Sequence, residues 1–256
     1  MEFIENRIKK RIQGKERQIG CWLSMGSHVA TEICASAGFD WVLIDMEHAP
    51  NDVPQVLSLI HAAAAYDVDI AVRAPWNDAV TIKRLLDQGV QTIVLPNVQT
   101  LAEAQEAVRS VRYPPRGYRG VSANSRSNRF GRMNNYFDHA DENICLILQI
   151  ETQLGRENAG KIAAVDGVDC LFVGPQDLAA GVGHLGNPSA KGAKDAMLDV
   201  ITTTVEAGCA AGILAFNEQD AKNWLAAGAS FVAVTGDTFL LARSTDAVVK
   251  SFKSEG

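Results

Sequence analysis

Polar side chains of the kinds that enzymes use follow four short apolar runs, at the points where those runs end. The segments are Asp45-Met46-Glu47-His48, Arg73, Gln149-Ile150-Glu151 and Gly174-Pro175-Gln176-Asp177. If the runs are parallel strands, their carboxyl ends meet at one edge, which is where α/β enzymes hold substrates. Carboxylates, an imidazole and a guanidinium gathered there could bind a cation, move a proton and stabilise an anion. A polar residue at the end of one strand is ordinary, so the prediction of an active site depends on all four strand ends being polar.

The two carboxylates Glu151 and Asp177 are candidates for metal ligands. Side chains alternate along a strand, so Gln149 and Glu151 share one face of the run 144–151, while the other face is wholly aliphatic and should pack against helices. Two close carboxylates repel each other unless a cation or a proton lies between them. Oxygen ligands suit Mg²⁺, Mn²⁺ or Co²⁺ better than zinc. The alternative is a pair of surface acids that cap neighbouring helices.

His48 is the histidine best placed to act as a base, because Asp45 and Glu47 precede it and a carboxylate can orient its ring for proton transfer. Arg73 brings a permanent cation to the same edge, where it could stabilise a developing oxyanion or pair with Asp45, and both can hold at once. No lysine ends a predicted strand, which weighs against Schiff-base chemistry. Asp87 ends a predicted helix, where the helix dipole disfavours an acid; a functional contact or simple surface tolerance would explain it.

The elements that must position these groups alternate along the chain as β and α. Apolar β-rich runs predict eight strands, at Ile19–Ser24, Trp41–Asp45, Asp69–Arg73, Thr92–Pro96, Ile144–Glu151, Val168–Gly174, Gly212–Ala215 and Phe231–Thr235. Helical patterns between them include Val29–Ala37, Val53–Ala65, Ala79–Asp87, Leu101–Val111, Met197–Ala207 and Glu218–Ala227. Eight β/α units in this length fit a closed (β/α)₈ barrel in one domain spanning residues 1–256, with a doubly wound open sheet as the main alternative.

Two segments interrupt this alternation. Residues 112–143 lack a long apolar run and are rich in Arg, Asn, Ser and Gly. A loop of this length in a compact domain is usually functional, and we expect an active-site wall or a subunit contact. The second segment is a helix-like stretch over Asp237–Phe252, which either closes the barrel or reaches a neighbouring subunit.

Composition excludes several classes of function. The chain has 256 residues, 47% of them hydrophobic, and a formal net charge of −6, so neither disorder nor a nucleic-acid partner is expected. No run approaches the roughly 18 apolar residues of a membrane span, and the start lacks the apolar core of a signal peptide. Five cysteines without a C-x-x-C pair indicate buried thiols in a reducing compartment. We therefore expect a cytoplasmic enzyme with small-molecule partners and no membrane.

Several longer runs resemble one known family, the HpcH/HpaI aldolases, which are metal-dependent, pyruvate-specific class II enzymes. The runs are GFDWVLIDMEHAPND (38–52), VRAPWND (72–78), IKRLLDQG (82–89), RYPPRGYRGVS (112–122), LQIET (148–152) and GVDCLFVGPQDLAAGVGHLGN (167–187). The resemblance extends from Gly20 to Ala242. It implies a (β/α)₈ barrel of the phosphoenolpyruvate/pyruvate type, usually a homohexamer in which the last helix is exchanged between subunits.

The resemblance also implies roles for single residues. Glu151 and Asp177 match the ligands of a divalent metal (Mg²⁺, Mn²⁺ or Co²⁺), and Arg73 matches the arginine beside the pyruvyl oxygen. His48 matches the histidine that assists proton transfer, and Asp87 the acid that partners it. The remaining matches are Asp45 and Gln149 as supporting polar residues, and the backbone from Gly174 to Gln176 as the segment that holds the pyruvate carboxylate. Relatives carry a small residue at position 176, so Gln176 puts the substrate preference in question.

The reaction implied is the reversible cleavage of a 4-hydroxy-2-oxo acid, such as 4-hydroxy-2-oxoheptanedioate or a 2-keto-3-deoxy sugar acid, to pyruvate and an aldehyde. An oxaloacetate decarboxylase on the same site is one alternative, because the same enolate forms when carbon dioxide leaves. A non-catalytic protein that binds 2-oxo acids is another. The joint presence of Glu151, Asp177, Arg73 and His48 argues against the latter, since a degenerate binder should have lost at least one of them.

Overall fold

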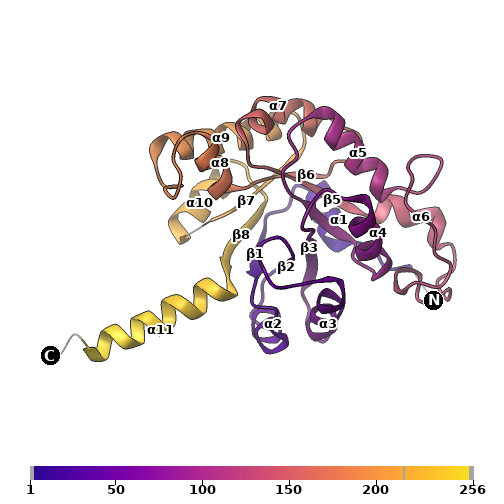
Figure 1. Cartoon of the computed structure of the whole chain (residues 1–256), viewed down its shortest axis with the longest axis horizontal. Coiled ribbons are helices and arrows are strands. Elements are labelled where there is room, and N and C mark those ends of the chain that lie inside the picture. The colour runs from indigo at the N-terminus through magenta and orange to yellow at the C-terminus, as the bar shows by residue number, and fades with distance from the viewer. Residues whose placement is uncertain (1–2, 216, 254–256) are drawn as a thin grey trace.

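Eight parallel strands form a closed barrel in the computed structural model, which describes residues 3–215 and 217–253 (Figure 1). The strands are β1 (Gln18–Leu23), β2 (Trp41–Asp45), β3 (Asp69–Arg73), β4 (Thr92–Leu95), β5 (Cys145–Ile150), β6 (Cys170–Val173), β7 (Ala210–Leu214) and β8 (Phe231–Gly236). Each strand pairs with the next in the chain, and β8 pairs with β1. The predicted (β/α)₈ barrel is confirmed, and the open sheet is excluded.

Helices alternate with these strands and pack around them (Figure 1). They are α1 (Arg7–Gln13), α2 (His28–Ala35), α3 (Val53–Ala63), α4 (Ala79–Asp87), α5 (Leu101–Val111), the 3₁₀ turn η1 (Arg126–Asn128), α6 (Tyr136–Asn143), α7 (Gln153–Ala163), α8 (Pro175–Gly181), α9 (Lys191–Glu206), α10 (Glu218–Ala226) and α11 (Asp237–Lys253). Polar N-cap side chains begin most of them: Asp52 and Asp78, for example, accept hydrogen bonds from backbone N–H groups in the first turns of α3 and α4.

Two apolar layers hold the barrel. Side chains of alternate strand positions fill the interior, and Ile8 and Ile12 of α1 join that cluster and close its amino end. Trp41 lies flat against Phe231 there, at 4.0 Å between ring centroids. A Cβ atom at Gly20 would lie 2.1 Å from the Trp41 ring, so only glycine fits beside it. The aliphatic face of β5 packs outward against the helices, as its alternation predicts.

The segment 112–143, here called the excursion, lies at the amino ends of the strands. The backbone N–H of Asn6 donates to Oδ1 of Asn143 at 2.8 Å, and the ring of Phe3 contacts that of His139. Within one chain the excursion therefore lies at the end opposite the predicted site and forms no wall of it. It also contains α6, which sequence patterning missed because only Tyr136 and Ala140 of this polar helix are buried.

The last helix, α11, leaves the barrel and extends into solvent (Figure 1). Its first residue, Asp237, is buried and accepts backbone hydrogen bonds from Ser24 and Met25, both at 3.0 Å. Every residue from Thr238 to Lys253 is exposed, including six large apolar side chains: Phe239, Leu240, Leu241, Val248, Val249 and Phe252. The prediction that this stretch is helical is confirmed. Among the described helices, none is long and apolar enough to cross a bilayer.

Candidate active site

We call the carboxyl end of the barrel the mouth, and Arg73 is firmly fixed there. Arg73 ends β3 and lies opposite Asp45, which ends β2. Its Nε and Nη2 donate to the two carboxylate oxygens of Asp45, both at 2.8 Å, and its Nη1 lies 2.7 Å from Oε2 of Glu47. Arg73 and Asp45 are both buried. Neighbouring strands thus supply a forked ion pair that holds one guanidinium in one orientation.

Electrostatics and packing both support this orientation. Burial alone would raise the pKa of Asp45, but the hydrogen bonds and charge of Arg73 outweigh it and hold that pKa below its ordinary value. The guanidinium also lies 4.9 Å from the centroid of the Trp22 ring, a cation–π distance. Sequence reasoning missed Trp22 because it considered polar strand ends only. Its position one residue before the end of β1 was the available signal.

Glu47 is a second residue that sequence reasoning did not assign to the site. Its Oε2 is buried and, apart from the ion pair with Arg73, has no well-aligned hydrogen bond among the described residues. Burial raises the pKa of Glu47, and the charges of Arg73 and His48 offset only part of that rise. Glu47 therefore holds Arg73 from the side opposite Asp45 and keeps an oxygen able to accept another donor.

Glu151 follows β5 and is buried at the mouth. Its Oε2 accepts a hydrogen bond of 2.6 Å from Nε2 of Gln149, so both polar side chains of this strand end lie together as alternation predicts. A Cβ atom at Gly174 would lie 2.5 Å from Oε2 of Glu151, so the glycine that follows β6 leaves space for this carboxylate. Burial, together with the charges of Glu47 and Asp177, raises the pKa of Glu151 from 4.5 to about 7.

Asp177 lies in the first turn of α8, the helix that Gly174 begins, and its side chain is exposed beside Gln176. Its negative charge acts on both Glu47 and Glu151 and raises the pKa of each, so the three carboxylates lie near one another at the mouth. Arg73 balances only part of this negative charge. A buried carboxylate beside other acids is a site where a cation lowers the energy.

The residues present fit a divalent cation with oxygen ligands. Within the described part of the chain, no group of three or more His, Cys, Asp or Glu side chains is arranged to hold a metal ion. Mg²⁺ commonly uses only one or two carboxylates and keeps several waters, which matches the donors that Glu151 and Asp177 offer. The room left by Gly174 is at the carboxylate oxygen itself.

Two predicted residues lie apart from the central group. His48 follows Glu47 on an exposed loop at the mouth, close enough for its charge to act on that carboxylate. Asp87 ends α4, which runs antiparallel to the strands and so carries Asp87 toward the opposite end of the barrel. There its Oδ1 lies 3.7 Å from Nη2 of Arg119, and burial raises the pKa of Asp87. One chain therefore does not bring Asp87 to His48.

Comparison with known proteins agrees with this architecture. The family model described as HpcH/HpaI aldolase/citrate lyase matches residues 18–244. The chain belongs to this family. The resemblance of the motifs is thereby confirmed, and with it the prediction of a carbon–carbon lyase of the aldolase type.

Relatives within the HpcH/HpaI family match almost end to end. A hydroxypyruvate/pyruvate aldolase of Deinococcus radiodurans is 47% identical over all of this chain and 92% of its own length. A 4-hydroxy-2-oxo-heptane-1,7-dioate aldolase of Escherichia coli is 46% identical over 98% of this chain and 97% of its own. A crystal structure of a family member from Burkholderia cenocepacia superposes with a TM-score of 0.93 at 39% identity, covering 97% of this chain and 99% of that one.

Proposed function

We propose that this protein is a divalent-metal-dependent aldolase that reversibly cleaves a 4-hydroxy-2-oxo acid into pyruvate and an aldehyde. The observation that carries the proposal is the mouth geometry, in which Asp45 and Glu47 hold Arg73 beside the carboxylates of Glu151 and Asp177. One relative is named a hydroxypyruvate/pyruvate aldolase, which supports pyruvate as the product. Another is named for a 4-hydroxy-2-oxo acid, which supports the substrate class. Neither name identifies the aldehyde of this chain.

Glu151 and Asp177 would hold the cation, with Gln149 fixing the Glu151 carboxylate through its 2.6 Å hydrogen bond. The bound cation would supply Lewis-acid polarisation of the substrate's carboxylate and 2-oxo oxygens. Carboxylate ligands must be ionised to bind a metal. Because the pKa of Glu151 is raised, a proton and the cation compete for the carboxylate of Glu151.

Arg73 would stabilise the negative charge that develops on the 2-oxo oxygen as the bond between carbons three and four breaks. Its pairing with Asp45 and Glu47 means that little reorganisation is needed when this charge appears. The backbone between Gly174 and Gln176 would hold the substrate's carboxylate at the start of α8. The Gln176 side chain is exposed there and would narrow the space beside the substrate.

His48 would take the proton from the 4-hydroxyl during cleavage and return it in the reverse reaction, while carbon three of the released enolate takes a proton from solvent to give pyruvate. His48 is exposed at the mouth, so a substrate there can reach its ring. If Asp87 orients His48, it must come from a second subunit, since one chain separates them. The buried Oδ1 of Asp87 has no hydrogen bond among the described residues beyond the 3.7 Å approach of Arg119, which leaves it able to accept a donor from a second subunit.

We also propose a homo-oligomer, by resemblance a hexamer, in which α11 packs on a neighbouring subunit. The helix leaves its own barrel and exposes Leu241, Val249 and Phe252, the last of them 82% exposed. Apolar surface of this kind is normally covered. Truncation before Thr238 should lower the number of subunits per particle, measured as the particle mass by light scattering divided by the subunit mass. An unchanged number of subunits would mean that α11 is not part of the interface.

The test of the function is a panel of aldehydes incubated with pyruvate and Mg²⁺ or Mn²⁺, with a chelator as the control. Carbon–carbon bond formation that requires the cation supports the proposal, and the best aldehyde identifies the substrate class. Oxaloacetate assayed with the same preparation measures decarboxylation at the same site. Pyruvate binding without turnover of any aldehyde or of oxaloacetate, under every divalent ion, would instead indicate a binding protein.

A further inference from the structure

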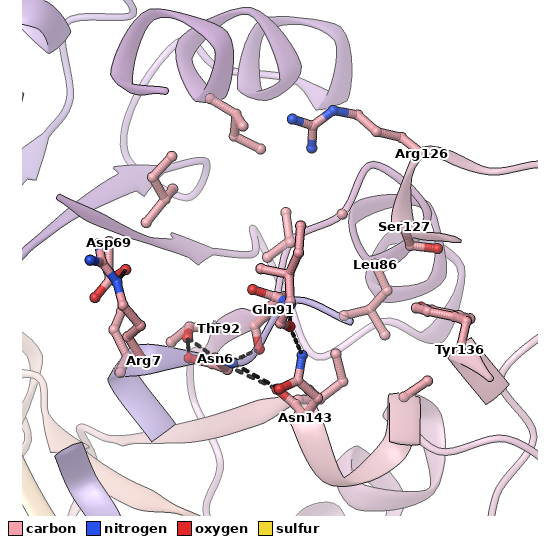
Figure 2. A pocket seen from close by; sticks show the side chains of 18 of the residues that line it. Asn6, Arg7, Asp69, Leu86, Gln91, Thr92, Arg126, Ser127, Tyr136 and Asn143 are labelled. Carbon is pink, nitrogen blue, oxygen red and sulfur yellow. Dashed lines mark hydrogen bonds and ion pairs between the residues drawn. The ribbon is translucent and has the colours of Figure 1, made fainter. Parts of the chain in front are cut away.

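A cavity of about 220 Å³ lies at the amino end of the barrel, away from the mouth (Figure 2). The starts of β3 and β4, the end of α4, the N-terminal segment and the excursion all line it. Asp69, which lines the cavity, begins β3, and Arg73 ends that strand, so about 13 Å of strand separates the cavity from the proposed catalytic group. Within one chain the cavity is therefore a different space from the proposed active site.

The polar floor of the cavity is already satisfied. Nδ2 of Asn6 donates to the backbone oxygens of Gln91 and Asn143 and to Oγ1 of Thr92, at 2.9 to 3.1 Å (Figure 2). Nε2 of Gln91 and Nδ2 of Asn143 both donate to the backbone oxygen of Ile4. These amide groups fix the floor and leave little capacity for a ligand.

Arg126 of the excursion differs from that floor. Its guanidinium reaches into the cavity from the opposite side, and Nη1 donates to the backbone oxygen of Gln88 at 2.6 Å (Figure 2). Gly89 makes this approach possible, because a Cβ atom there would lie 2.8 Å from Nη1. One bond to the end of α4 thus fixes the direction of the guanidinium and leaves its other N–H groups unused by any interaction found among the described residues.

No carboxylate balances this charge within the described residues. Arg7, the other cation near the floor, pairs with Asp67 and Asp69, and Arg11 also pairs with Asp69. Among the described residues Arg126 has no ion pair of this kind, and neither has Arg129, an exposed arginine that also lines the cavity. Burial lowers the pKa of Arg126, and the charge of Arg129 lowers it further, because no acid compensates.

We propose that this cavity binds a small organic carboxylate, with Arg126 pairing with its charge and the apolar wall of Ile60, Val68, Leu86 and Val90 contacting its body. The guanidinium of Arg126 is held in one direction and can bind one carboxylate through two parallel hydrogen bonds, while Arg129 adds a second positive charge to the lining. The volume equals that of about seven waters and is below that of drug-sized ligand sites, so the ligand is a small metabolite. It would join the excursion to α4 and to the starts of β3 and β4.

The test uses the whole enzyme with Mg²⁺ and without pyruvate, because pyruvate is itself a small carboxylate that the cavity would bind. The Arg126→Ala variant then separates binding in the cavity from binding at the mouth. Butyrate is the probe, because it carries a carboxylate and a short apolar body but no 2-oxo group. Butyramide, of the same shape without the charge, is the matched ligand control, and inorganic phosphate tests for any anion. Calorimetric titration should give a dissociation constant of about 1 mM for butyrate and no detectable binding of butyramide.

Variants separate this site from any other. Arg126→Ala should weaken butyrate binding about 10-fold or more, the cost of a lost charge-assisted hydrogen bond, and Arg126→Lys should retain part of the affinity. Arg109→Ala, which removes an exposed arginine of α5, is the matched control and should bind butyrate as the unmodified protein does. Equal affinity in Arg126→Ala, binding of butyramide as strong as that of butyrate, phosphate displacing butyrate at equal concentration, or no butyrate binding would overturn the proposal.

Discussion

Each end of the barrel holds an arginine that is at least half-buried, but the two arginines differ in whether carboxylates pair with them. At the mouth, Arg73 has a forked pair to Asp45 and an ion pair to Glu47. At the amino end, Arg126 has a backbone carbonyl and no carboxylate among the described residues. The mouth carries more negative than positive charge around its arginine, and the amino end carries the reverse.

The ligands proposed for the two ends follow from this difference in charge. Excess carboxylate at the mouth favours a cation, and only a cation lets Glu151 and Asp177 stay ionised together at low cost. An uncompensated guanidinium at the other end favours an anion. The predictions below change one charge at a time, so each reports whether its end of the barrel depends on that charge.

The largest effect is expected from Arg73→Ala. Loss of a group that stabilises a developing oxyanion should lower kcat about 10²- to 10³-fold. The substitution also leaves Asp45 buried without its partner, which should lower the free energy of unfolding by about 3 kcal/mol or more. Aldol cleavage and thermal unfolding measure the two effects, with Arg109→Ala as the control. Near-normal cleavage by a folded Arg73→Ala variant would remove Arg73 from the mechanism.

Glu151→Gln should stabilise the metal-free protein at alkaline pH. The pKa of Glu151 in the folded protein, about 7, lies above the ordinary value of 4.5. The contribution of Glu151 to the free energy of unfolding is therefore most favourable below pH 4.5 and is lost as the pH rises through 7. Removing the charge should therefore raise the free energy of unfolding near pH 8 by at most about 3 kcal/mol, and hardly change it near pH 4. Denaturant unfolding at the two pH values measures this. Equal effects at both would contradict the raised pKa.

Glu47→Gln should have an intermediate effect, because Arg73 keeps its fork to Asp45 but loses one ion pair. We expect kcat to fall about 10-fold, the cost of one charge-assisted hydrogen bond that positions Arg73. If Glu47 acts through Arg73, adding Glu47→Gln to Arg73→Ala should cost little further activity. Fully additive losses in that double-mutant cycle would mean that Glu47 acts independently of Arg73.

The smallest effect is expected from Arg126→Ala on stability without ligand. The variant loses one hydrogen bond to the end of α4 and a cation near the negative end of that helix dipole. Together these should lower the free energy of unfolding by roughly 0.5 to 1 kcal/mol. Denaturant unfolding beside Arg109→Ala measures the difference. A loss as large as that of Arg73→Ala would mean that Arg126 is a structural residue comparable to Arg73.

Much of the fold and the mouth follows from local sequence patterns. The eight strands and the inward direction of Gln149 and Glu151 come from alternation along single strands, which needs no knowledge of distant contacts. The convergence of Asp45, Arg73 and Glu151 follows from parallel strands that end at one edge. The positions of these residues at the mouth could be predicted from the sequence because the barrel is regular.

What sequence reasoning missed depends on contacts between segments far apart in the chain. Glu47 joins the site because its side chain folds back onto Arg73, and Trp22 because β1 lies beside β2. Helix α6 is stabilised by packing rather than by its own pattern. The separation of Asp87 from His48 follows from the direction of α4, which a match of motifs does not encode.

The most direct test of the central claim is the exchange of pyruvate's methyl protons with D₂O, followed by proton NMR, because it needs no knowledge of the aldehyde. The account predicts exchange that requires Mg²⁺ and stops on addition of a chelator. It should also be lost in Glu151→Gln, Asp177→Asn and Arg73→Ala. Exchange that continues in chelator-treated protein, or at an undiminished rate in Glu151→Gln, would contradict a cation held by Glu151 and Asp177 beside Arg73.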